Sequence, residues 1–376
     1  MSGTGSSDLA KRLLLLLCSM LVGLLLVEGA LRVRQWIRHG TVKNTVHEFA
    51  IDPESNLRIP QPLRDSGRIK TDSRGFRNPE LDQPKPAGRI RLAFLGGSTT
   101  FCAEASSNEN TWPHLAWESL SAAYPEAEFD YVNASLPGGS VEESLINLRV
   151  RVAPVEPDVI VVYHATNDLS HDTRMLAAQQ GIFRAGGEEP GLLARWSLSW
   201  YLLEKNLRLR QRQKASTAAS GRLRFQPDRL ARGFEDRLVE LLGASRGVAR
   251  LATVATFSHK VRRDQPTAEQ LKNCDTSLYY MPYMTVEGLL DGFDAYNRAI
   301  RRAAERSGAV VIEGEETIPG DDRHFNDSVH FTDAGSHLMA NRIVDALRNS
   351  AEFRVLVESA AASRPAGLSQ SGGPVQ

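Results

Sequence analysis

Arg91-Leu92-Ala93-Phe94-Leu95-Gly96-Gly97-Ser98-Thr99-Thr100 is the stretch of sequence that decides the fold. A short run that is apolar on both faces and ends at a breaker is typical of a buried strand. Gly96 and Gly97 allow a tight turn where a side chain would clash. In an open α/β sheet, ligands bind beyond the carboxyl ends of the strands. We therefore expect the Ser98 hydroxyl at the edge of a sheet, although a plain turn or a helix N-cap explains this stretch equally well.

The chain from residue 89 to residue 350 alternates between strand-like and helix-like stretches. The expected strands are Arg91–Leu95, Asp130–Asn133, Val159–Tyr163, Ala249–Thr256 and Ala309–Ile312, and the expected helices are Trp112–Tyr124, Val141–Val152, Asp228–Leu242, Gly288–Ser307 and Ala334–Ser350. Such alternation implies right-handed crossovers and a parallel sheet covered by helices on both faces. The sequence therefore predicts an α/β protein with a three-layer α/β/α, flavodoxin-like core of about five parallel strands.

The N-terminal segment, residues 1–39, is predicted to be a signal anchor or transmembrane helix. Lys11-Arg12 precede an uncharged, leucine-rich run over residues 13–27, which Glu28 interrupts. A basic start before an apolar core is the pattern of a secretory signal, and no clear cleavage site follows it. The uncharged core is short for a span of about 20 residues, so Glu28 is expected near a membrane interface. A buried N-terminal helix is the alternative, and the arginines at both ends leave the orientation open.

Three further segments flank or interrupt the alternating region. Residues 40–88 are polar and proline-rich and are expected to form a stalk or collar. An insertion at about residues 170–227 has no clear strand and carries two tryptophans and a basic run. It is interpreted as a lid or binding loop, as a solvated basic helix, or as a contact with a membrane surface or an anionic polymer. Residues 351–376 end in a stretch rich in Ser, Gly, Pro and Ala and are expected to be disordered.

Composition excludes some classes of function. The 376 residues carry 45 basic and 45 acidic side chains, so no basic field indicates binding to nucleic acid. Cysteine-rich and histidine-rich metal motifs are absent from the sequence, and we expect no metal and no cofactor. Cys18 lies in the apolar N-terminal run, which leaves a pair between Cys102 and Cys274 as the only candidate disulfide.

Four residue types with related chemistry fall at the ends of expected strands. Gly138 follows the second strand, Asn167 follows the third, and Asp327 and His330 lie near the C-terminus, three residues apart. A serine is a poor nucleophile unless a base is adjacent. His330 is expected to accept the proton of Ser98, and Asp327 to orient the imidazole. The backbone N–H groups of Ser98 and Gly138 and the side chain of Asn167 are the expected oxyanion hole.

Each of these residues also has a simpler explanation. Asn167 or Asp327 alone could cap a helix, Gly138 could serve a turn, and His330 could be an ordinary core or surface histidine. A metal site formed by His324, Asp327 and His330 is another reading of the same region. Three polar residues near the expected site are assigned hydrogen bonding within loops: His164, Asp168 and His171. The simpler explanations do not account for all four residue types in this order at strand ends.

In this combination the chain resembles the SGNH (GDSL-like) hydrolase superfamily. The four blocks that carry the resemblance are Gly96-Gly97-Ser98-Thr99, Gly138, Thr166-Asn167-Asp168 and Asp327-x-x-His330. The similarity extends from about residue 90 to residue 347. Two positions depart from the family pattern, because Gly97 replaces the aspartate of Gly-Asp-Ser and Ala165 replaces the glycine of the third block. Neither position carries the proton or the charge, so the resemblance implies an active enzyme of a divergent branch.

The expected function is that of a membrane-anchored, extracytoplasmic serine esterase or deacylase. Its substrate would be an acyl ester of a small molecule, a glycan or a lipid. An O-acyltransferase that uses the same residues, with an alcohol in place of water, is the first alternative. A non-catalytic binding or assembly module on the same scaffold is the second, and it predicts the loss of a catalytic residue, which the sequence does not show.

Overall fold

A computed structural model describes residues 4–39, 49–182, 191–217 and 222–363. The chain divides into two compact units. One unit contains residues 1–48 and 186–212, and the other contains residues 49–185 and 213–376. The larger unit holds the sheet and all the residues of the predicted site.

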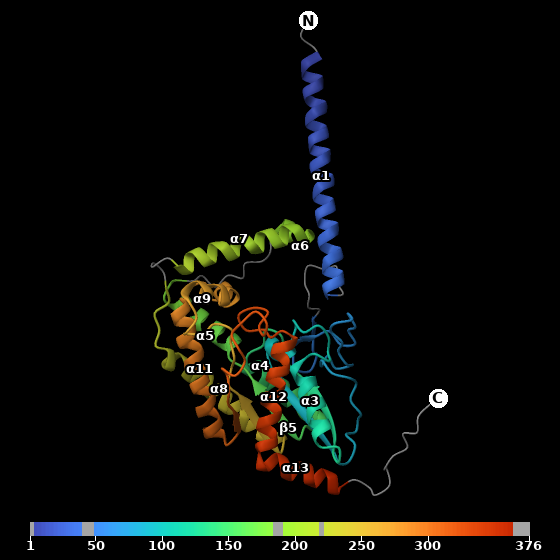
Figure 1. Ribbon diagram of the computed structural model, residues 1–376, viewed down its shortest axis with the longest axis vertical. Helices are drawn as coiled ribbons and strands as arrows, with labels where there is room; N and C mark the ends of the chain where they lie inside the picture. The colour runs from blue at the N-terminus through green and yellow to red at the C-terminus, as the bar shows by residue number, and fades with distance from the viewer. Residues whose placement is uncertain (1–3, 40–48, 183–190, 218–221, 364–376) are drawn as a thin grey trace, which may run out of the picture. The chain divides into compact units, whose positions relative to one another are not determined.

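The larger unit is built on one parallel sheet of five strands (Figure 1). The strands are β3 (Arg89–Gly96), β4 (Glu128–Asn133), β5 (Val159–Tyr163), β6 (Leu251–Ala255) and β7 (Val310–Ile312). Their spatial order is β4-β3-β5-β6-β7, and every neighbouring pair is parallel. The chain reverses its direction of winding between β3 and β5, which is the flavodoxin-like switch point where ligands bind in such sheets. The predicted fold class is confirmed.

Helices cover both faces of the sheet, as parallel strands require. On one face α3 (Trp112–Ala123) packs against α12 (Asp333–Asn349), and on the other α8 (Pro227–Val248) packs against α4 (Val141–Asn147) and α11 (Val286–Ser307). The remaining helices of this unit are α2 (Ser98–Phe101), α5 (Thr166–Gln179), α9 (Thr267–Asn273), α10 (Asp275–Tyr280) and α13 (Ala351–Ala362). Helix α4 continues as a π-helical turn over Leu148–Val152, so the helix predicted for Val141–Val152 is present with a change of pitch.

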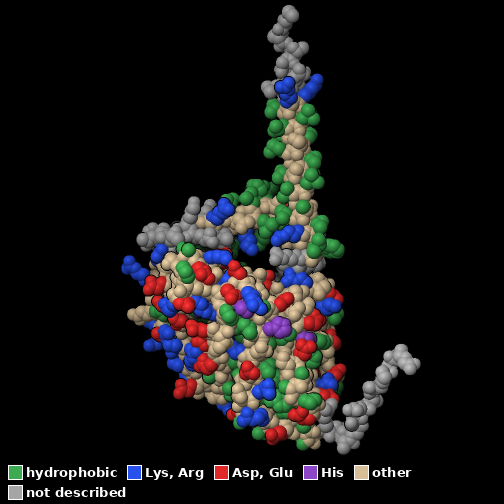
Figure 2. All heavy atoms as spheres, viewed as in Figure 1, with side chains coloured by type: hydrophobic (Ala, Val, Ile, Leu, Met, Phe, Trp, Pro, Cys, Tyr) green, Lys and Arg blue, Asp and Glu red, His purple; other side chains and the backbone are tan. Residues whose placement is uncertain are grey.

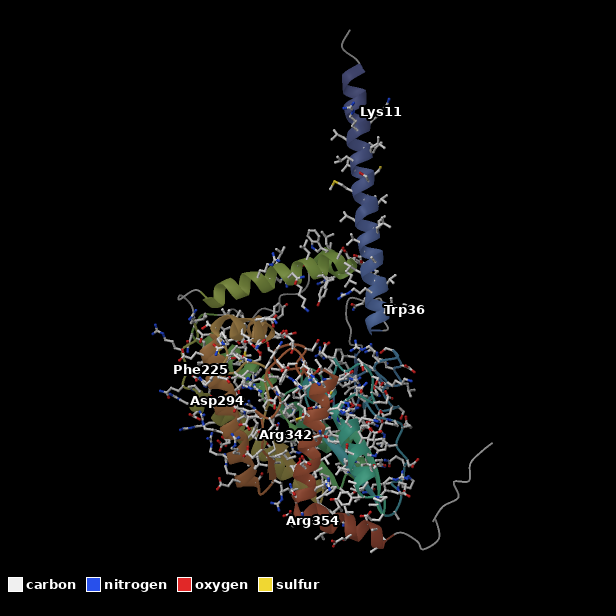
Figure 3. All side chains as sticks on the ribbon, viewed as in Figure 1. Lys11, Trp36, Phe225, Asp294, Arg342 and Arg354 are labelled. Carbon is white, nitrogen blue, oxygen red and sulfur yellow. The ribbon has the colours of Figure 1, made fainter. Side chains whose placement is uncertain are left out.

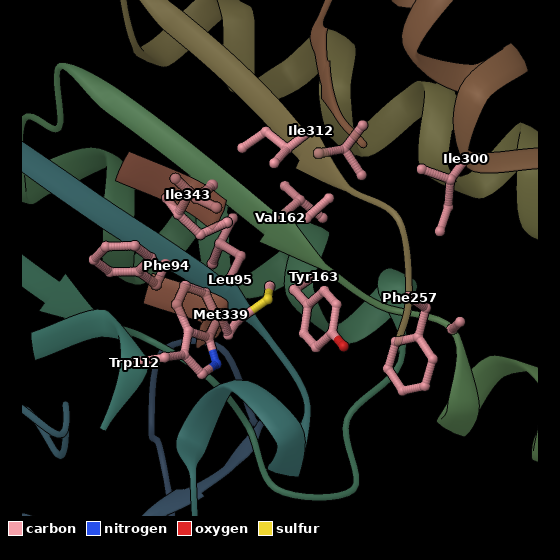
Figure 4. Close-up of a cluster of buried hydrophobic side chains, with 14 of the residues drawn as sticks. Phe94, Leu95, Trp112, Val162, Tyr163, Phe257, Ile300, Ile312, Met339 and Ile343 are labelled. Carbon is pink, nitrogen blue, oxygen red and sulfur yellow. The ribbon is translucent and has the colours of Figure 1, made fainter. Parts of the chain in front are cut away.

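Buried aromatic side chains pack beneath the carboxyl ends of the strands (Figure 4). Phe94 meets Trp112 edge-on with ring centroids 5.2 Å apart, and Tyr163 stacks on Phe257 at 4.9 Å. All four side chains are inaccessible to solvent. Aromatic pairs of this kind contribute about 0.5–1.5 kcal/mol beyond the burial of their area. Because Phe94 and Tyr163 lie in β3 and β5, this packing holds rigid the two strands that lead into the predicted site.

Residues 49–88 form a collar that packs on the larger unit. The collar begins with an antiparallel hairpin of β1 (Phe49–Ile51) and β2 (Arg58–Pro60). Leu57 and Ile59 bury their side chains against Leu136, which lies in the loop after β4. The described part of the segment is therefore a collar and not an extended stalk, and residues 40–48 lie outside the described residues.

The C-terminal segment corrects one prediction. We expected residues 351–376 to be disordered, but residues 351–362 form α13. The Ser350 hydroxyl accepts from the Phe353 N–H and caps the helix, and Phe353, Leu356 and Val357 are buried. The expectation followed the Ser, Gly and Pro content of the end of the chain and missed this apolar stripe with its cap. Residues 364–376 lie outside the described residues.

The smaller unit consists of three described helices. They are α1 (Thr4–His39), α6 (Leu192–Trp196) and the part of α7 (Leu198–Thr217) that extends to residue 212. Within α1, Lys11–Ile37 is long and apolar enough to cross a membrane by length and composition, and a signal sequence would pass the same test. Lys11 and Trp36 lie toward the two ends of this segment (Figure 3). The insertion predicted at about 170–227 thus divides, because residues 186–212 belong to the unit that contains α1.

Candidate active site

Ser98 occupies the first position of the short helix α2, immediately after β3. Gly97 is the N-cap, and Cys102, in the left-handed conformation at φ 56°, ends the helix. Position 96 requires glycine because a Cβ there would lie 2.6 Å from the Tyr163 carbonyl oxygen and 2.0 Å from the Thr100 hydroxyl. The two glycines therefore permit the sharp turn that the sequence predicted, and Ser98 is only partly buried while its neighbours are buried.

The carbonyl groups of α2 are bound by side chains, because a helix of four residues cannot satisfy them itself. Trp112 Nε1 donates to the Thr99 oxygen at 3.1 Å, and Asn133 Nδ2 donates to the Thr100 oxygen at 3.1 Å. Arg77 Nη1 donates to the oxygens of residues 101 and 102 at 2.8 and 2.7 Å. These buried donors fix the helix that carries Ser98. The roles of Arg77 and Asn133 could not be predicted from the sequence, because both depend on contacts between distant segments.

The structure brings Ser98, His330 and Asp327 together. Ser98 Oγ lies 2.8 Å from His330 Nε2, and Asp327 Oδ2 lies 2.8 Å from His330 Nδ1. An ionised carboxylate can only accept, so Nδ1 carries the proton and donates to Asp327. In the neutral imidazole, Nε2 is then the acceptor for the Ser98 hydroxyl. This is the geometry of a nucleophile, a base and an orienting acid.

A tight turn aligns Asp327 with His330. Asp327 Oδ1 accepts from the backbone N–H groups of Val329 at 2.9 Å and His330 at 2.8 Å. The Asn326 N–H donates to the His330 oxygen at 2.8 Å and closes the turn. The spacing of three residues, noted in the sequence, therefore lets one carboxylate bind the backbone with one oxygen and the imidazole with the other.

The charges of this pair shift the two pKa values in opposite directions. Burial alone would raise the pKa of Asp327, but the charge and hydrogen bonds of His330 and of the backbone outweigh it and lower the pKa. Burial alone would lower the pKa of His330, but Asp327 and, more weakly, Glu104 raise it. The pair thus favours an ionised carboxylate beside an imidazole that accepts a proton readily.

Two contacts join the loop after α2 to the region around His330. Asn326 Nδ2 donates to Glu104 Oε2 at 2.9 Å. The N–H and hydroxyl of Ser106 donate to the two oxygens of Asp333 at 2.9 and 2.6 Å. Segments more than 200 residues apart in sequence therefore hold the serine and the histidine at a fixed distance. The sequence offered no indication of these contacts.

Gly138 lies in the loop after β4, and Asn167 lies in the first turn of α5, where its side chain meets Gly97. Gly138 has φ +82°, which favours glycine, and this explains the residue independently of any catalytic role. The Asn167 amide donates to the Gly139 oxygen at 2.8 Å. A Cβ on Gly97 would lie 2.4 Å from Asn167 Nδ2. The absence of a side chain at position 97, where the family pattern has aspartate, is thus matched by an asparagine amide that fills the same space.

Asp168 and His164 are buried behind this site. The two oxygens of Asp168 each lie 3.3 Å from the Val141 N–H at the start of α4, and Arg237 lies 3.6 Å from one of them. Burial raises the pKa of Asp168 to about 7 and lowers that of His164 to about 3. His164 Nε2 lies 2.8 Å from the Ser144 hydroxyl. Both side chains make hydrogen bonds, as expected, but their partners lie in helix α4 and not within a loop. They tie the start of α4 to the end of β5 and the start of α5.

The other predicted candidates lie elsewhere. His171 is exposed beside Asp172, with 3.4 Å between Nδ1 and Oδ1. His324 Nδ1 lies 2.7 Å from Asp321, and within the described residues no group of three or more His, Cys, Asp or Glu side chains could hold a metal ion. Cys102 and Cys274, the candidate disulfide, are each free and buried.

One protein family matches this chain, and several solved structures are similar to it. Residues 94–338 match the family model of the GDSL-like lipase/acylhydrolase family. No curated protein matches the chain significantly. Solved structures similar to this chain include LAE5, an alpha/beta hydrolase enzyme from the metagenome of Lake Arreo, Spain, with 16% identity and a TM-score of 0.42 over 69% of this chain and 95% of that one. The acetylxylan esterase Axe2 of Geobacillus stearothermophilus has 14% identity and a TM-score of 0.41 over 68% and 93%.

Proposed function

This chain belongs to the GDSL-like lipase/acylhydrolase family, and we propose that it is a serine esterase or deacylase in which Ser98 is the nucleophile. The family makes the chain a hydrolase enzyme and supports esterase activity broadly. The observation that carries the finer assignment is the continuous pair of 2.8 Å contacts from Ser98 Oγ through His330 to Asp327. That arrangement gives a weak nucleophile the adjacent base that it needs.

The reaction proceeds by acyl transfer through Ser98. The Ser98 oxygen attacks the ester carbonyl carbon while His330 Nε2 takes the hydroxyl proton, and the carbonyl oxygen becomes an oxyanion. The C–O bond to the alcohol then breaks, and Nε2 returns the proton to the departing alkoxide. Water repeats the sequence on the acyl-enzyme, releasing the acid and restoring the Ser98 hydroxyl. Asp327 holds Nδ1 protonated and stabilises the imidazolium that forms in each half.

The proposed oxyanion hole consists of the backbone N–H groups of Ser98 and Gly138 and the side chain of Asn167. The Asn167 amide has two N–H groups, and its bond to the Gly139 oxygen orients the other. One donor of this kind is worth on the order of 10²–10³ in kcat, or about 2.7–4 kcal/mol. The contact between the Asp168 carboxylate and the Val141 N–H joins the starts of α5 and α4, which helps to hold the proposed oxyanion donors in place before the reaction.

The proposal extends to location. Lys11–Ile37 of α1 would anchor the enzyme in a membrane with the catalytic unit outside the cytoplasm. The substrate would then be an acyl ester of a glycan, a lipid or a small molecule on that side. The collar packs on the catalytic unit through the contact of Leu57 and Ile59 with Leu136.

The test is ester hydrolysis by the full chain in detergent micelles, with short-chain p-nitrophenyl esters. Ser98→Ala is expected to lower kcat on the order of 10⁴- to 10⁶-fold. Ser359→Ala, which changes an exposed serine of α13, is the matched control and should hydrolyse the esters as the wild type does. A Ser98→Ala protein that turned over at the wild-type rate would refute the assignment. Product analysis with added sugar alcohols separates hydrolysis from acyl transfer, because transfer yields an acylated sugar in place of free acid.

A further inference from the structure

Two charged side chains of α1 fasten α6 and α7 to it within the smaller unit. Glu28 accepts from the backbone N–H groups of Leu198 at 2.8 Å and Ser199 at 2.9 Å, which are the first two residues of α7. The hydroxyls of Ser197 and Ser199 also donate to Glu28, at 3.0 and 2.8 Å. Arg32 donates to the Trp196 oxygen at 2.9 Å, at the end of α6, and to Glu28 at 2.7 Å.

This junction matches charge to helix ends. The N-terminus of a helix exposes N–H groups and carries a partial positive charge, and the C-terminus exposes carbonyls and carries a partial negative charge. Glu28 meets the start of α7 and Arg32 meets the end of α6, so each charge binds the complementary helix end. The carboxylate that interrupts the apolar run of α1 is thereby fully hydrogen-bonded. A charged group near a bilayer is tolerated where it is paired in this way.

The junction lies at the expected depth of a membrane interface. Glu28 follows Arg12 by 16 residues, which at 1.5 Å per residue is about 24 Å along the helix. The hydrocarbon core of a bilayer is about 30 Å thick. If α1 spans a membrane, Lys11 and Arg12 mark one interface and Glu28 lies close to the other. Helix α7 leaves α1 at this level and runs across its axis (Figure 1).

One face of α6 and α7 is apolar and exposed. Trp200, Leu203 and Leu207 recur at i, i+3 and i+7 and share a side of α7, with 45–50% of each side chain exposed. Helix α6 adds exposed Leu192, Leu193 and Trp196. Figure 2 shows hydrophobic side chains on α6 and the beginning of α7, on the side toward the N-terminal end of α1. Tryptophan is enriched at the interface between membrane and water.

The rest of this segment is basic. Residues 191–217 contain six Lys or Arg and one Glu, a net charge of +5. Exposed Lys205 lies opposite the apolar face of α7, because two residues turn the helix by about 200° from Leu203. Over its first three turns α7 carries Trp200, Leu203 and Leu207 on one side and Lys205 on the other, which is the arrangement of helices that lie in the plane of an anionic lipid surface. Arg210 follows Leu203 by seven residues and so lies on the same side of the helix, which means that the apolar face ends after Leu207.

We propose that α6 and α7 lie in the interface of an anionic lipid bilayer, with Trp196, Trp200, Leu203 and Leu207 inserted among the acyl chains. This inference rests on the proposed anchoring by α1. Apolar side chains are exposed both on α1 and on the first turns of α7, on either side of the Glu28 junction, and the positive charge of the segment complements anionic headgroups. The basic insertion is thus a second membrane contact that fixes the level at which the chain leaves the bilayer. Coulombic attraction to the headgroups makes this contact sensitive to salt.

The test measures lipid contact on two faces of α7 in the full chain, reconstituted in phosphatidylcholine vesicles with and without phosphatidylglycerol. In a Cys18→Ser background, Leu203→Cys and Lys205→Cys each carry an environment-sensitive fluorophore. Nitroxide lipids are the quenchers. We expect blue-shifted emission and strong quenching at position 203 but not at position 205, with the contrast larger when anionic lipid is present. Glu28→Ala, which removes the acceptor at the start of α7, should shrink that contrast.

A third label distinguishes this inference from the anchoring on which it rests. Leu21→Cys lies in the middle of the proposed span and should be quenched by nitroxides deep in the bilayer. Quenching at position 21 with equal signals at positions 203 and 205 would overturn the interfacial placement and leave the anchor standing. Loss of quenching at position 21 would overturn both. A label at position 203 that responded only to an added anionic polysaccharide would identify a polymer contact and would also overturn the proposal.

Discussion

A methyl group at position 97 should disable the enzyme through Asn167. Gly97 has φ −91° and ψ −150°, so it does not lie in the left-handed region and alanine can adopt its φ. The obstacle is the Cβ, which would lie 2.4 Å from Asn167 Nδ2 and 3.3 Å from the Gly139 oxygen. Carbon and nitrogen cannot approach that closely, because favourable contacts between heavy atoms begin near about 3.5 Å. The amide of Asn167 must therefore rotate away, because the end of a side chain moves more easily than the backbone oxygen of Gly139.

The magnitude follows from what Asn167 is proposed to do. If its amide is an oxyanion donor, Gly97→Ala removes one donor and should lower kcat on the order of 10²–10³-fold. The stability cost should be small, about 0.5–1.5 kcal/mol, because one hydrogen bond to the Gly139 oxygen is lost. Asn167→Ala should lower kcat by the same factor and should also relieve the clash. The kcat of the double variant is then expected to equal that of Asn167→Ala alone, which corresponds to a coupling energy of about 3 kcal/mol between positions 97 and 167.

The assay is steady-state hydrolysis of p-nitrophenyl acetate by the four proteins of this cycle, as full chains in detergent, with thermal unfolding in parallel. Gly243→Ala is the matched control. Its position in α8 has no atom within 4 Å of an added Cβ, so activity should be unchanged. Full activity in Gly97→Ala would refute the steric argument. Losses that multiplied in the double variant would show that Gly97 and Asn167 act independently, which the contact does not allow.

Three further outcomes are expected. Asp327 raises the pKa of His330 against the effect of burial, and the base must be neutral. The value of kcat/KM should therefore rise with pH through an inflection above about 6.5. Asp327→Asn should move that inflection to lower pH and lower kcat about 10⁴-fold. An inflection at the wild-type pH would contradict the pairing of Asp327 with His330. Arg77→Met removes the buried donor of four carbonyl oxygens, among them those of Phe101 and Cys102. It should lower the free energy of unfolding, measured by chemical denaturation, by about 3–5 kcal/mol. Arg77→Lys should recover only part of this stability, because an ammonium group lacks the planar fork of donors. Burial raises the pKa of Cys102 and of Cys274 to about 12. Iodoacetamide should therefore label both thiols only once the protein is denatured, and no reductant should be needed. Labelling that required a reductant would reveal a disulfide.

The sheet could be predicted from the sequence because its three central strands, β3, β5 and β6, are buried on both faces. Val159–Tyr163 matches its strand at both ends, and the other four expected strands differ from the observed ones by one or two residues at an end. Short, mostly apolar runs such as Val159–Tyr163 carry this information locally. Helix α5 was missed because it begins within the block Thr166-Asn167-Asp168, where the residues suggested a loop. Its helical conformation depends on the packing of Leu169 and Thr173, which are buried by other elements.

The proposed site was visible in the sequence only where its residues carry chemistry. Ser98, Asp327 and His330 stood out only in combination, because each alone has a simpler explanation. In the structure His330 lies 2.8 Å from Ser98 and 2.8 Å from Asp327. Arg77 and Asn133 did not stand out, although they hold the carbonyls of α2. Their partners are backbone carbonyl oxygens, which every residue carries. A contact of this kind therefore leaves no pattern in the sequence from which it could be predicted before the fold is known.

The position of Glu28 within an apolar helix is explained by its contacts with a segment distant in sequence. In the sequence it only shortened an apolar run and suggested that the residue lies near an interface. Besides Arg32, four donors bind it from residues 197–199, about 170 positions later, and two of them are serine hydroxyls that a solvated helix would have left to water. A carboxylate in an apolar helix and a Ser-Leu-Ser sequence at the start of a basic helix are each unremarkable alone. Together they form a charge-to-helix-end contact that neither segment could satisfy by itself. The basic insertion and the N-terminal helix are therefore best understood as one element of the enzyme, which is why the vesicle experiment labels both.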